Sequence, residues 1–309
     1  HLLNPNRPPI LLDPPAPGVH PQPLSDSRDA LAWLDAEYPN LLAAQQAAVA
    51  HARHPTVWQL ALAMNTVQLR RGHRHDRVAV WQAALAASDH LPDPSARMHA
   101  YRRLGAVLAD LGRHEEGIAH LHQSLALAEE HRDLGQQAET HRLLAGAWEE
   151  QREDRKALEH AERGLELRRT LGQPTREAEA LNQVGWHLAW LGEFDAARTH
   201  CEAALAILRR HNDPAGEAAT LDSLGYIDHR GGRHRQAIGY YRQALPLLAE
   251  LGDILRTADT LDSLGHPYAA LGEYEQARAV WEKALELYQQ QGREQSADRI
   301  QEQLDGLRN

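Results

Sequence analysis

The residues of this sequence with the most obvious chemical potential are its twenty histidines. The closest groups are His51 with His54, HRH at 73–75, HLH at 120–122, and His229 with His234. Only His51 and His54 have a spacing that zinc sites use, and both are expected at a helix end. We therefore predict that the histidines of these groups are solvated at the surface and that the chain has no metal site.

Catalytic motifs are absent from the sequence. It contains no G-x-S-x-G, no H-E-x-x-H and no Gly-rich phosphate loop, and neither lysine, Lys156 or Lys283, follows a glycine as a P-loop requires. We expect neither an enzyme nor a cofactor. The single Cys201 excludes an internal disulfide, which fits a reducing cytoplasm.

Composition narrows the class of protein. The chain has 309 residues, of which 42% are hydrophobic and 25% charged, as in soluble globular proteins. Abundant Ala, Leu, Glu and Arg, with few β-branched residues, predict an all-α fold. A net charge of -10 argues against nucleic-acid binding, and the sequence contains no apolar run of membrane length. We expect a cytoplasmic protein.

Two tryptophans lie one helical turn apart in LNQVGWHLAWLGEF, at 181–194. Side chains at i and i+4 lie on the same face of a helix, so Trp186 and Trp190 should lie side by side. They could be ordinary core between helices, or a partly exposed aromatic surface of the kind that binds ligands. Which of these alternatives holds depends on how the helices around the two tryptophans pack.

Those elements repeat every 40 residues without an insertion. One position is always small, at Gly105, Ala145, Gly185, Gly225 and Gly265, and the position before it is always aliphatic. A small residue there lets two antiparallel helices approach closely, so the period describes a helical hairpin stacked on copies of itself. Cys201 falls where later repeats have Tyr241 and Trp281, which predicts a buried, inert thiol.

The segment LGHPYAALGEYEQARAVWEKALELY, at 264–288, resembles the tetratricopeptide repeat, whose consensus reads Leu-Gly-x2-Tyr and then Gly-x-Tyr/Phe-x2-Ala-x3-Phe-x2-Ala. The resemblance implies a right-handed superhelix of helical hairpins. It covers residues 56–293 as six repeats, the first of them degenerate. The six residues beyond the usual 34 are expected to lengthen the second helix and the loop that follows it.

The flanking segments complete the predicted organisation. Residues 1–24 hold eight of the sixteen prolines and should form an extended linker. Residues 25–55 should form N-terminal capping helices, one capped by Ser25 or Asp26 and the next starting near Pro39. Residues 294–309 should form a C-terminal capping helix, with apolar residues at Ala297, Ile300, Leu304 and Leu307.

The same resemblance implies that the first helix of each hairpin lines a concave groove, which puts Trp186 and Trp190 on that face, whereas Leu181, Val184 and Leu188 supply the core. The groove would hold a peptide, a protein segment or a small molecule. The residue at one repeated position changes from arginine through asparagine to aspartate. This trend would place the acidic part of a ligand near Arg102 and Arg142, its backbone at Asn182 and its basic end near Asp222 and Asp262. The same residues could instead form only a solvated face. The predicted site residues are Arg102, Arg142, Asn182, Trp186, Trp190, Asp222, Tyr226, Asp262 and His266.

A second resemblance concerns ALAWLDAEYPNLLAA, at 30–44. It is similar to the segment that precedes a tetratricopeptide array in large AfsR-like (SARP-type) transcriptional regulators of actinomycetes, with Trp33, Leu34, Asp35, Glu37, Pro39, Asn40 and Leu41 all matching. From the residues alone, Trp33 and Leu34 would seal the N-terminal end and Asp35 or Asn40 would cap helices. The resemblance implies the C-terminal sensor domain of a regulator of antibiotic or other secondary metabolism, without its DNA-binding and ATPase modules.

Two functions remain open at this point. The chain could be a non-enzymatic sensor that binds a ligand in its groove and signals to other domains of the parent regulator. It could instead be a structural scaffold for self-association, as a homo-oligomer, or for intramolecular repression.

Overall fold

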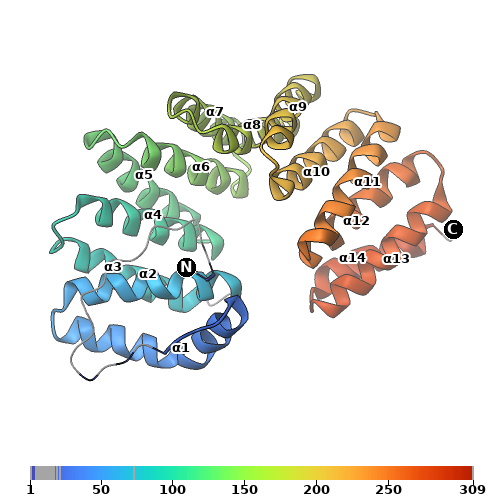
Figure 1. The fold of residues 1–309 in the computed structure, drawn as a ribbon. Helices are drawn as coiled ribbons and strands as arrows, with labels where there is room; N and C mark the ends of the chain where they lie inside the picture. The colour runs from blue at the N-terminus through green and yellow to red at the C-terminus, as the bar shows by residue number, and fades with distance from the viewer. Residues whose placement is uncertain (1, 4–17, 19, 21, 72–73, 308–309) are drawn as a thin grey trace. The chain divides into compact units, whose positions relative to one another are not determined.

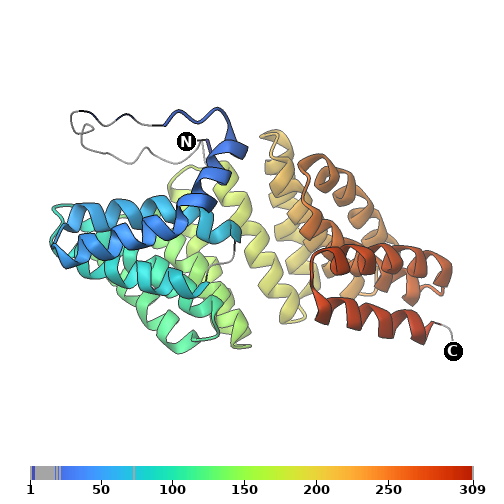
Figure 2. The same cartoon turned by 90° about the horizontal axis from the view of Figure 1, so that it is seen from below.

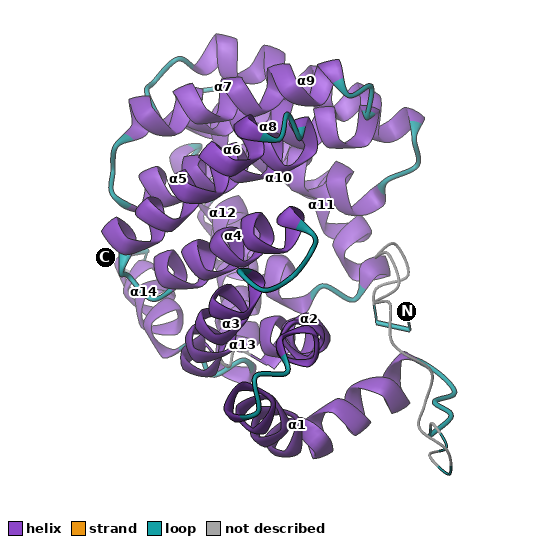
Figure 3. Cartoon of the chain, turned by 90° about the vertical axis from the view of Figure 1, so that its left-hand side faces the viewer, coloured by secondary structure: helices purple, strands orange, loops and turns teal. Residues whose placement is uncertain are grey.

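The structure is a computed structural model that describes residues 2–3, 18, 20, 22–71 and 74–307. This part of the chain contains fourteen α-helices and no strand, which confirms the all-α prediction (Figure 3). No helix within it is long and apolar enough to span a membrane. Most of the predicted linker, residues 1–24, lies outside the described residues.

The helices and their bounds are α1 Ser27–Ala50, α2 His54–Arg71, α3 Arg74–Ser88, α4 Pro94–Asp110, α5 His114–Glu130, α6 Leu134–Glu150, α7 Asp154–Thr170, α8 Pro174–Trp190, α9 Phe194–Arg210, α10 Pro214–Arg230, α11 His234–Leu251, α12 Ile254–Ala270, α13 Tyr274–Gln290 and α14 Glu294–Gly306. From α4 onward they begin at 94, 114, 134 and so on to 294, so two helices fill each 40-residue period.

Short turns join the repeated helices. The middle residue of each turn has a positive φ, a backbone conformation that favours glycine, as at Gly112 and Gly192. Arg132, Arg152 and Asn212 occupy this position in three turns, with φ of 54°, 61° and 52°. The prediction of a longer loop after the second helix is wrong. The turn between hairpins at 131–133 is as short as the turn within a hairpin at 111–113. Two helices of 17 residues each account for most of the period.

The chain divides into two compact units, His1–Gln151 and Arg152–Asn309. Figures 1 and 2 show the helices of the second unit in colours from yellow-green to red. Within this unit each helix packs on the next along the chain, and α10 also packs directly on both α8 and α12. These three first helices of successive hairpins therefore form one continuous layer, which carries most of the residues discussed below.

Close helix approach explains the small residue of each repeat. A Cβ atom on Gly225 would lie 2.6 Å from the ring of Tyr241, and one on Gly265 would clash with the indole of Trp281. The predicted buried cysteine is confirmed at the equivalent place, where Cys201 packs against Gly185 and is fully buried. Burial raises the pKa of its thiol to about 12.

The terminal helices differ in how well the sequence predicted them. Ala297, Ile300 and Leu304 of α14 are buried against the core of the second unit, as their spacing predicted. At the other end, the break expected at Pro39 is wrong, because α1 is one helix that contains this proline. Proline already has a helical φ and removes only one backbone hydrogen bond, so tertiary packing can keep it inside a helix.

Because α1 is a single helix, only one of the residues proposed as helix caps near the N-terminus serves as a cap. The Oδ1 atom of Asp26 accepts hydrogen bonds from the backbone of Arg28 and Asp29, at 2.8 and 2.9 Å, so it is the predicted N-cap. Asn40 caps nothing, since it lies within α1 and donates to Glu37. Asp35 is likewise inside the helix. Leu34 packs, partly buried, against the core of the first unit.

Candidate ligand-binding site

Three aromatic side chains form a cluster on α8 and α10, which we call the aromatic cluster: Trp186, Trp190 and Tyr226. The ring centroids of Trp186 and Tyr226 are 4.9 Å apart, and Trp190 lies 6.0 Å from each of them. Trp190 is 36% exposed and the other two are partly buried, whereas Leu181, Val184 and Leu188 on the same helix are buried. The two tryptophans therefore form a partly exposed surface, as one of the two sequence interpretations proposed.

Two arginines lie against this cluster. The guanidinium carbon of Arg152 is 5.5 Å from the ring centroid of Trp190, and that of Arg230 is 5.8 Å from that of Tyr226. Arg230 also donates to the Tyr226 hydroxyl over 3.3 Å. Cation–π attraction of this kind holds a guanidinium beside an aromatic ring without neutralising its charge. Neither arginine has a carboxylate partner among the described residues.

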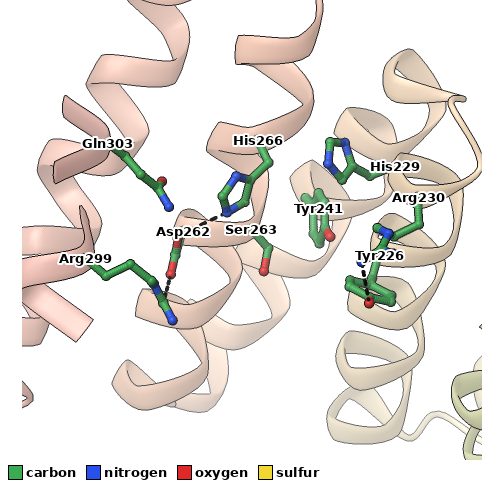
Figure 4. Close-up of a pocket in the computed structure, with 9 residues that line it drawn as sticks. All are labelled: Tyr226, His229, Arg230, Tyr241, Asp262, Ser263, His266, Arg299 and Gln303. Carbon is green, nitrogen blue, oxygen red and sulfur yellow. Dashed lines mark hydrogen bonds and ion pairs between the residues drawn. The ribbon is translucent and has the colours of Figure 1, made fainter. Parts of the chain in front are cut away.

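A pocket of about 420 Å³ adjoins the cluster through Tyr226 (Figure 4). The side chains that line it come from α10, α11, α12 and α14, and they are Tyr226, His229, Arg230, Tyr241, Asp262, Ser263, His266, Arg299 and Gln303. Most of these groups are polar, and hydrogen-bond donors predominate. The pocket and the aromatic cluster together form one surface that combines apolar rings with polar and positive groups.

The one carboxylate of the pocket is already neutralised. Asp262 is 5% exposed, and Figure 4 shows it between His266, 3.6 Å away, and Arg299 of the terminal helix, with which it forms an ion pair. The hydroxyl of Tyr288 also donates to it over 3.2 Å. Burial would raise the pKa of Asp262, but the contact with His266 and the charge of Arg299 together lower it.

The two histidines of the pocket, His229 and His266, and the neighbouring His234 are close enough to influence each other. The Nδ1 atoms of His229 and His234 are 3.1 Å apart, and the rings of His229 and His266 are 6.1 Å apart. Burial, and then electrostatic repulsion by His234, His266 and Arg230, lower the pKa of His229 to about 4. His229 is thus neutral at neutral pH. In the described part of the chain, no three His, Cys, Asp or Glu side chains are grouped so that they could hold a metal ion.

Other predicted site residues of the second unit point toward neighbouring helices. Asp222 accepts a hydrogen bond from the Thr260 hydroxyl of α12 over 2.7 Å, and burial raises its pKa to about 6. The Oδ1 atom of Asn182 accepts from the thiol of Cys201 over 3.4 Å. Both side chains are partly buried between helices rather than exposed on an open face.

In the first unit, the two predicted arginines share one carboxylate. Arg102 is 7% exposed and lies 3.5 Å from Glu139 of α6, which also binds Arg142 over 2.8 Å. The expectation that Arg102 and Asp262 are exposed in a groove is therefore wrong. Residues at this repeated position contact the first helix of the following hairpin or, at the end of the chain, α14. Arg102 contacts Glu139 of α6, Asp222 contacts Thr260 of α12, and Asp262 contacts Arg299 of α14.

Sequence reasoning did not select Arg152, Arg230, His229, Arg299 or Gln303. Arg230 occupies the position of Trp190 one period later, so the 40-residue pattern already placed it on the same face. Arg299 stands 40 residues after Asp259, but that position was not assigned to the groove, so the repeat pattern did not point to Arg299. Nothing in the pattern distinguishes Arg152, which lies in a turn.

Comparisons with known proteins agree with this architecture. One tetratricopeptide repeat family model matches residues 97–170 and 176–250, and a second tetratricopeptide repeat model matches residues 257–290. No curated protein shows significant sequence similarity to the chain.

Solved structures with the same fold include three from sensor and signalling proteins. A Rap protein in complex with competence and sporulation factor is 16% identical, with a TM-score of 0.61 over 82% of this chain and 75% of its own. The apo quorum sensor NprR from B. thuringiensis is 16% identical, with a TM-score of 0.62 over 86% of this chain and 81% of its own.

The third is a signal transduction ATPase with numerous domains and a tetratricopeptide repeat sensor, from Pyrococcus horikoshii. It is 15% identical, with a TM-score of 0.61 over 81% of this chain but only 44% of its own length. At these identities the structural matches show the fold alone. Together with the 40-residue period and the matched repeat models, they lead to one conclusion: the chain belongs to the tetratricopeptide repeat family.

Proposed function

We propose that this chain is a non-enzymatic sensor domain that binds a peptide or protein segment on the surface formed by the aromatic cluster and the adjoining pocket. The observation that carries the proposal is the exposure of Trp190 beside Trp186 and Tyr226, in helices whose other large apolar residues are buried. Exposed aromatic groups of this kind are typical centres of binding energy.

The shape of the surface favours an extended ligand. The cluster lies on α8 and α10 and the pocket continues to α12 and α14, with Tyr226 common to both. A segment of several residues could place an apolar side chain on the rings and polar groups in the pocket. Two structural relatives, a Rap protein complexed with competence and sporulation factor and the quorum sensor NprR, support a ligand-sensing role by analogy.

A separate feature, the segment at 30–44, supports a proposal about the larger protein to which this domain belongs. The segment at 30–44 resembles the one that precedes the repeats of AfsR-like regulators, which implies a sensor within a transcriptional regulator of secondary metabolism. The signal transduction ATPase from P. horikoshii offers a precedent for such an arrangement, since it combines numerous domains with a tetratricopeptide repeat sensor. In such a protein the ligand signal would pass to the other domains.

Selection from a displayed library of random twelve-residue peptides tests the proposal. Peptides selected on the wild-type chain should lose at least about tenfold in affinity for the double variant Trp186→Ala, Trp190→Ala, because loss of aromatic contacts at a binding centre costs more than 1 kcal/mol. Tyr274→Ala is the matched control, since Tyr274 is 54% exposed and lies outside the site. If no peptide depends on the tryptophans, the proposed function is wrong.

A second candidate, self-association, is favoured by one observation. Leu251, Ile254 and Leu255, around the turn between α11 and α12, are 43%, 57% and 57% exposed. Exposed neighbouring apolar groups can mark a contact between copies of a chain. Light scattering after gel filtration would support this role only if the wild-type chain is oligomeric and Leu255→Asp makes it monomeric.

A further inference from the structure

The charge at the site differs from the charge of the chain. The net charge is -10, and arginines of the second unit commonly hold a carboxylate: Arg198 contacts Glu202 at 2.8 Å and Arg209 contacts Glu217 at 2.7 Å. Arg152 and Arg230 are exceptions, because no carboxylate of the described residues pairs with either of them. Both lie on the aromatic cluster.

Acidic residues near the cluster do not offset these charges. Asp262 is paired with Arg299, and the Asp228 carboxylate is held by Arg233 at 2.7 Å. Asp222 is partly buried between α10 and α12, where it accepts a hydrogen bond from the Thr260 hydroxyl. Arg152 and Arg230 are therefore positive groups of the aromatic cluster that no carboxylate partner among the described residues neutralises.

The arrangement of each arginine suits a carboxylate next to an apolar group. A guanidinium beside an aromatic ring keeps N–H groups directed outward, and those donors match the two oxygens of a carboxylate. The ring surface alongside remains available for an apolar side chain. We propose that the aromatic cluster with Arg152 and Arg230 binds an acidic peptide segment, in which an aspartate or glutamate stands beside an apolar residue.

This inference rests on the proposed function, and it reverses the ligand polarity that the sequence suggested for this end of the chain. The sequence placed a basic end of the ligand near Asp222 and Asp262. Asp262 is already neutralised by Arg299, and Asp222 accepts a hydrogen bond from Thr260 between two helices. The charged groups that lie on the aromatic cluster itself are the two arginines.

The peptide selection described above tests the inference through the composition of the selected peptides. We expect Asp and Glu to be enriched about threefold or more over the unselected library, next to apolar residues. A selected peptide resynthesised with Asn and Gln in place of Asp and Glu should bind the wild-type chain about tenfold more weakly by calorimetry.

The variants remove each arginine with little strain. Arg230→Gln keeps a long polar side chain on α10, and Arg152→Asn places in the turn a residue that tolerates the positive φ of 61°. The double variant should bind the acidic peptide and its amide analogue within about twofold of each other. Arg163→Gln is the matched control, because Arg163 is an exposed arginine of α7 paired with Glu166. Circular dichroism checks that each variant is folded.

The outcomes separate the two proposals. Peptides that depend on Trp186 and Trp190 but show no acidic enrichment would overturn this inference and leave the proposed function standing. An acidic preference that survives removal of both arginines would also overturn it. Selection of no tryptophan-dependent peptide would end both proposals.

Discussion

His187 makes the stability of the second unit depend on pH. It lies on α8 next to Trp186, is 1% exposed, and neither ring nitrogen has a hydrogen-bond partner among the described residues. Burial lowers its pKa from 6.5 to about 4. The folded chain therefore holds the imidazole neutral where the unfolded chain would bind a proton.

The sign of the effect follows from this depression. The contribution of His187 to stability is greatest above pH 6.5 and is lost as the pH falls toward the folded pKa of about 4. With these two values, unfolding becomes easier by about 2 kcal/mol near pH 5 and by about 3 kcal/mol near or below pH 4. Asp222 acts in the opposite direction between pH 4 and 6, because its folded pKa is raised to about 6.

Because the two groups oppose each other, the prediction concerns a difference between variants. Urea unfolding of the wild-type chain, of His187→Leu and of His187→Gln should be followed near pH 7.5 and near pH 5. At the higher pH, His187→Leu should be more stable than wild type by about 1–2 kcal/mol, because it removes two buried, unpaired polar atoms. This advantage should grow by about 2 kcal/mol at the lower pH.

If leucine packs poorly at this position, His187→Gln still tests the prediction. The glutamine side chain does not ionise, so this variant should also lack the pH dependence that His187 causes. His211→Gln, at an exposed position, should keep the wild-type difference between the two pH values. If wild type and both His187 variants lose the same stability between the two pH values, the assignment of a depressed pKa to His187 is refuted.

Three further predictions concern the repeats. Arg132→Gly should raise the free energy of unfolding by about 1 kcal/mol, because Arg132 has a φ of 54°; no gain in urea midpoint would contradict this. Gly265→Ala should cost about 1–3 kcal/mol through its clash with Trp281, whereas Gly239→Ala, with open space around it, should not destabilise the chain. Cys201 should react with an aromatic disulfide reagent at least about a hundredfold more slowly in the native chain than in urea, because the thiol is buried; equal rates would show that it is accessible.

Much of the fold was predictable because the repeat is regular. A small residue every 40 positions marks a close crossing of two helices, and the structure has such a crossing at Gly225 and Tyr241. The spacing of Ala297, Ile300 and Leu304 likewise predicted their burial. Pro39 was misread because a local rule about proline competes with packing, and packing along α1 prevailed.

The candidate site was only partly predictable. Trp186, Trp190 and Tyr226 were assigned to one face from the period alone, and the structure brings their rings together. The charged residues of the same pattern were treated as exposed, although Arg102 and Asp262 are buried. Their partners, Glu139 and Arg299, stand 37 positions later in the chain, on the next first helix or on α14.

The local pattern of apolar and small residues was therefore enough to specify the repeated helices, the hairpin period and the helix face of the aromatic residues. Those properties depend on contacts within one hairpin, which the period describes directly. The pattern specified neither the length of every turn nor the course of α1 at Pro39. Which charges remain unpaired depends on side chains from other hairpins and from the terminal helix. Arg102 and Arg299 each have a carboxylate within reach after folding, whereas Arg152 and Arg230 lie on aromatic rings without one, and these distances exist only in the tertiary structure.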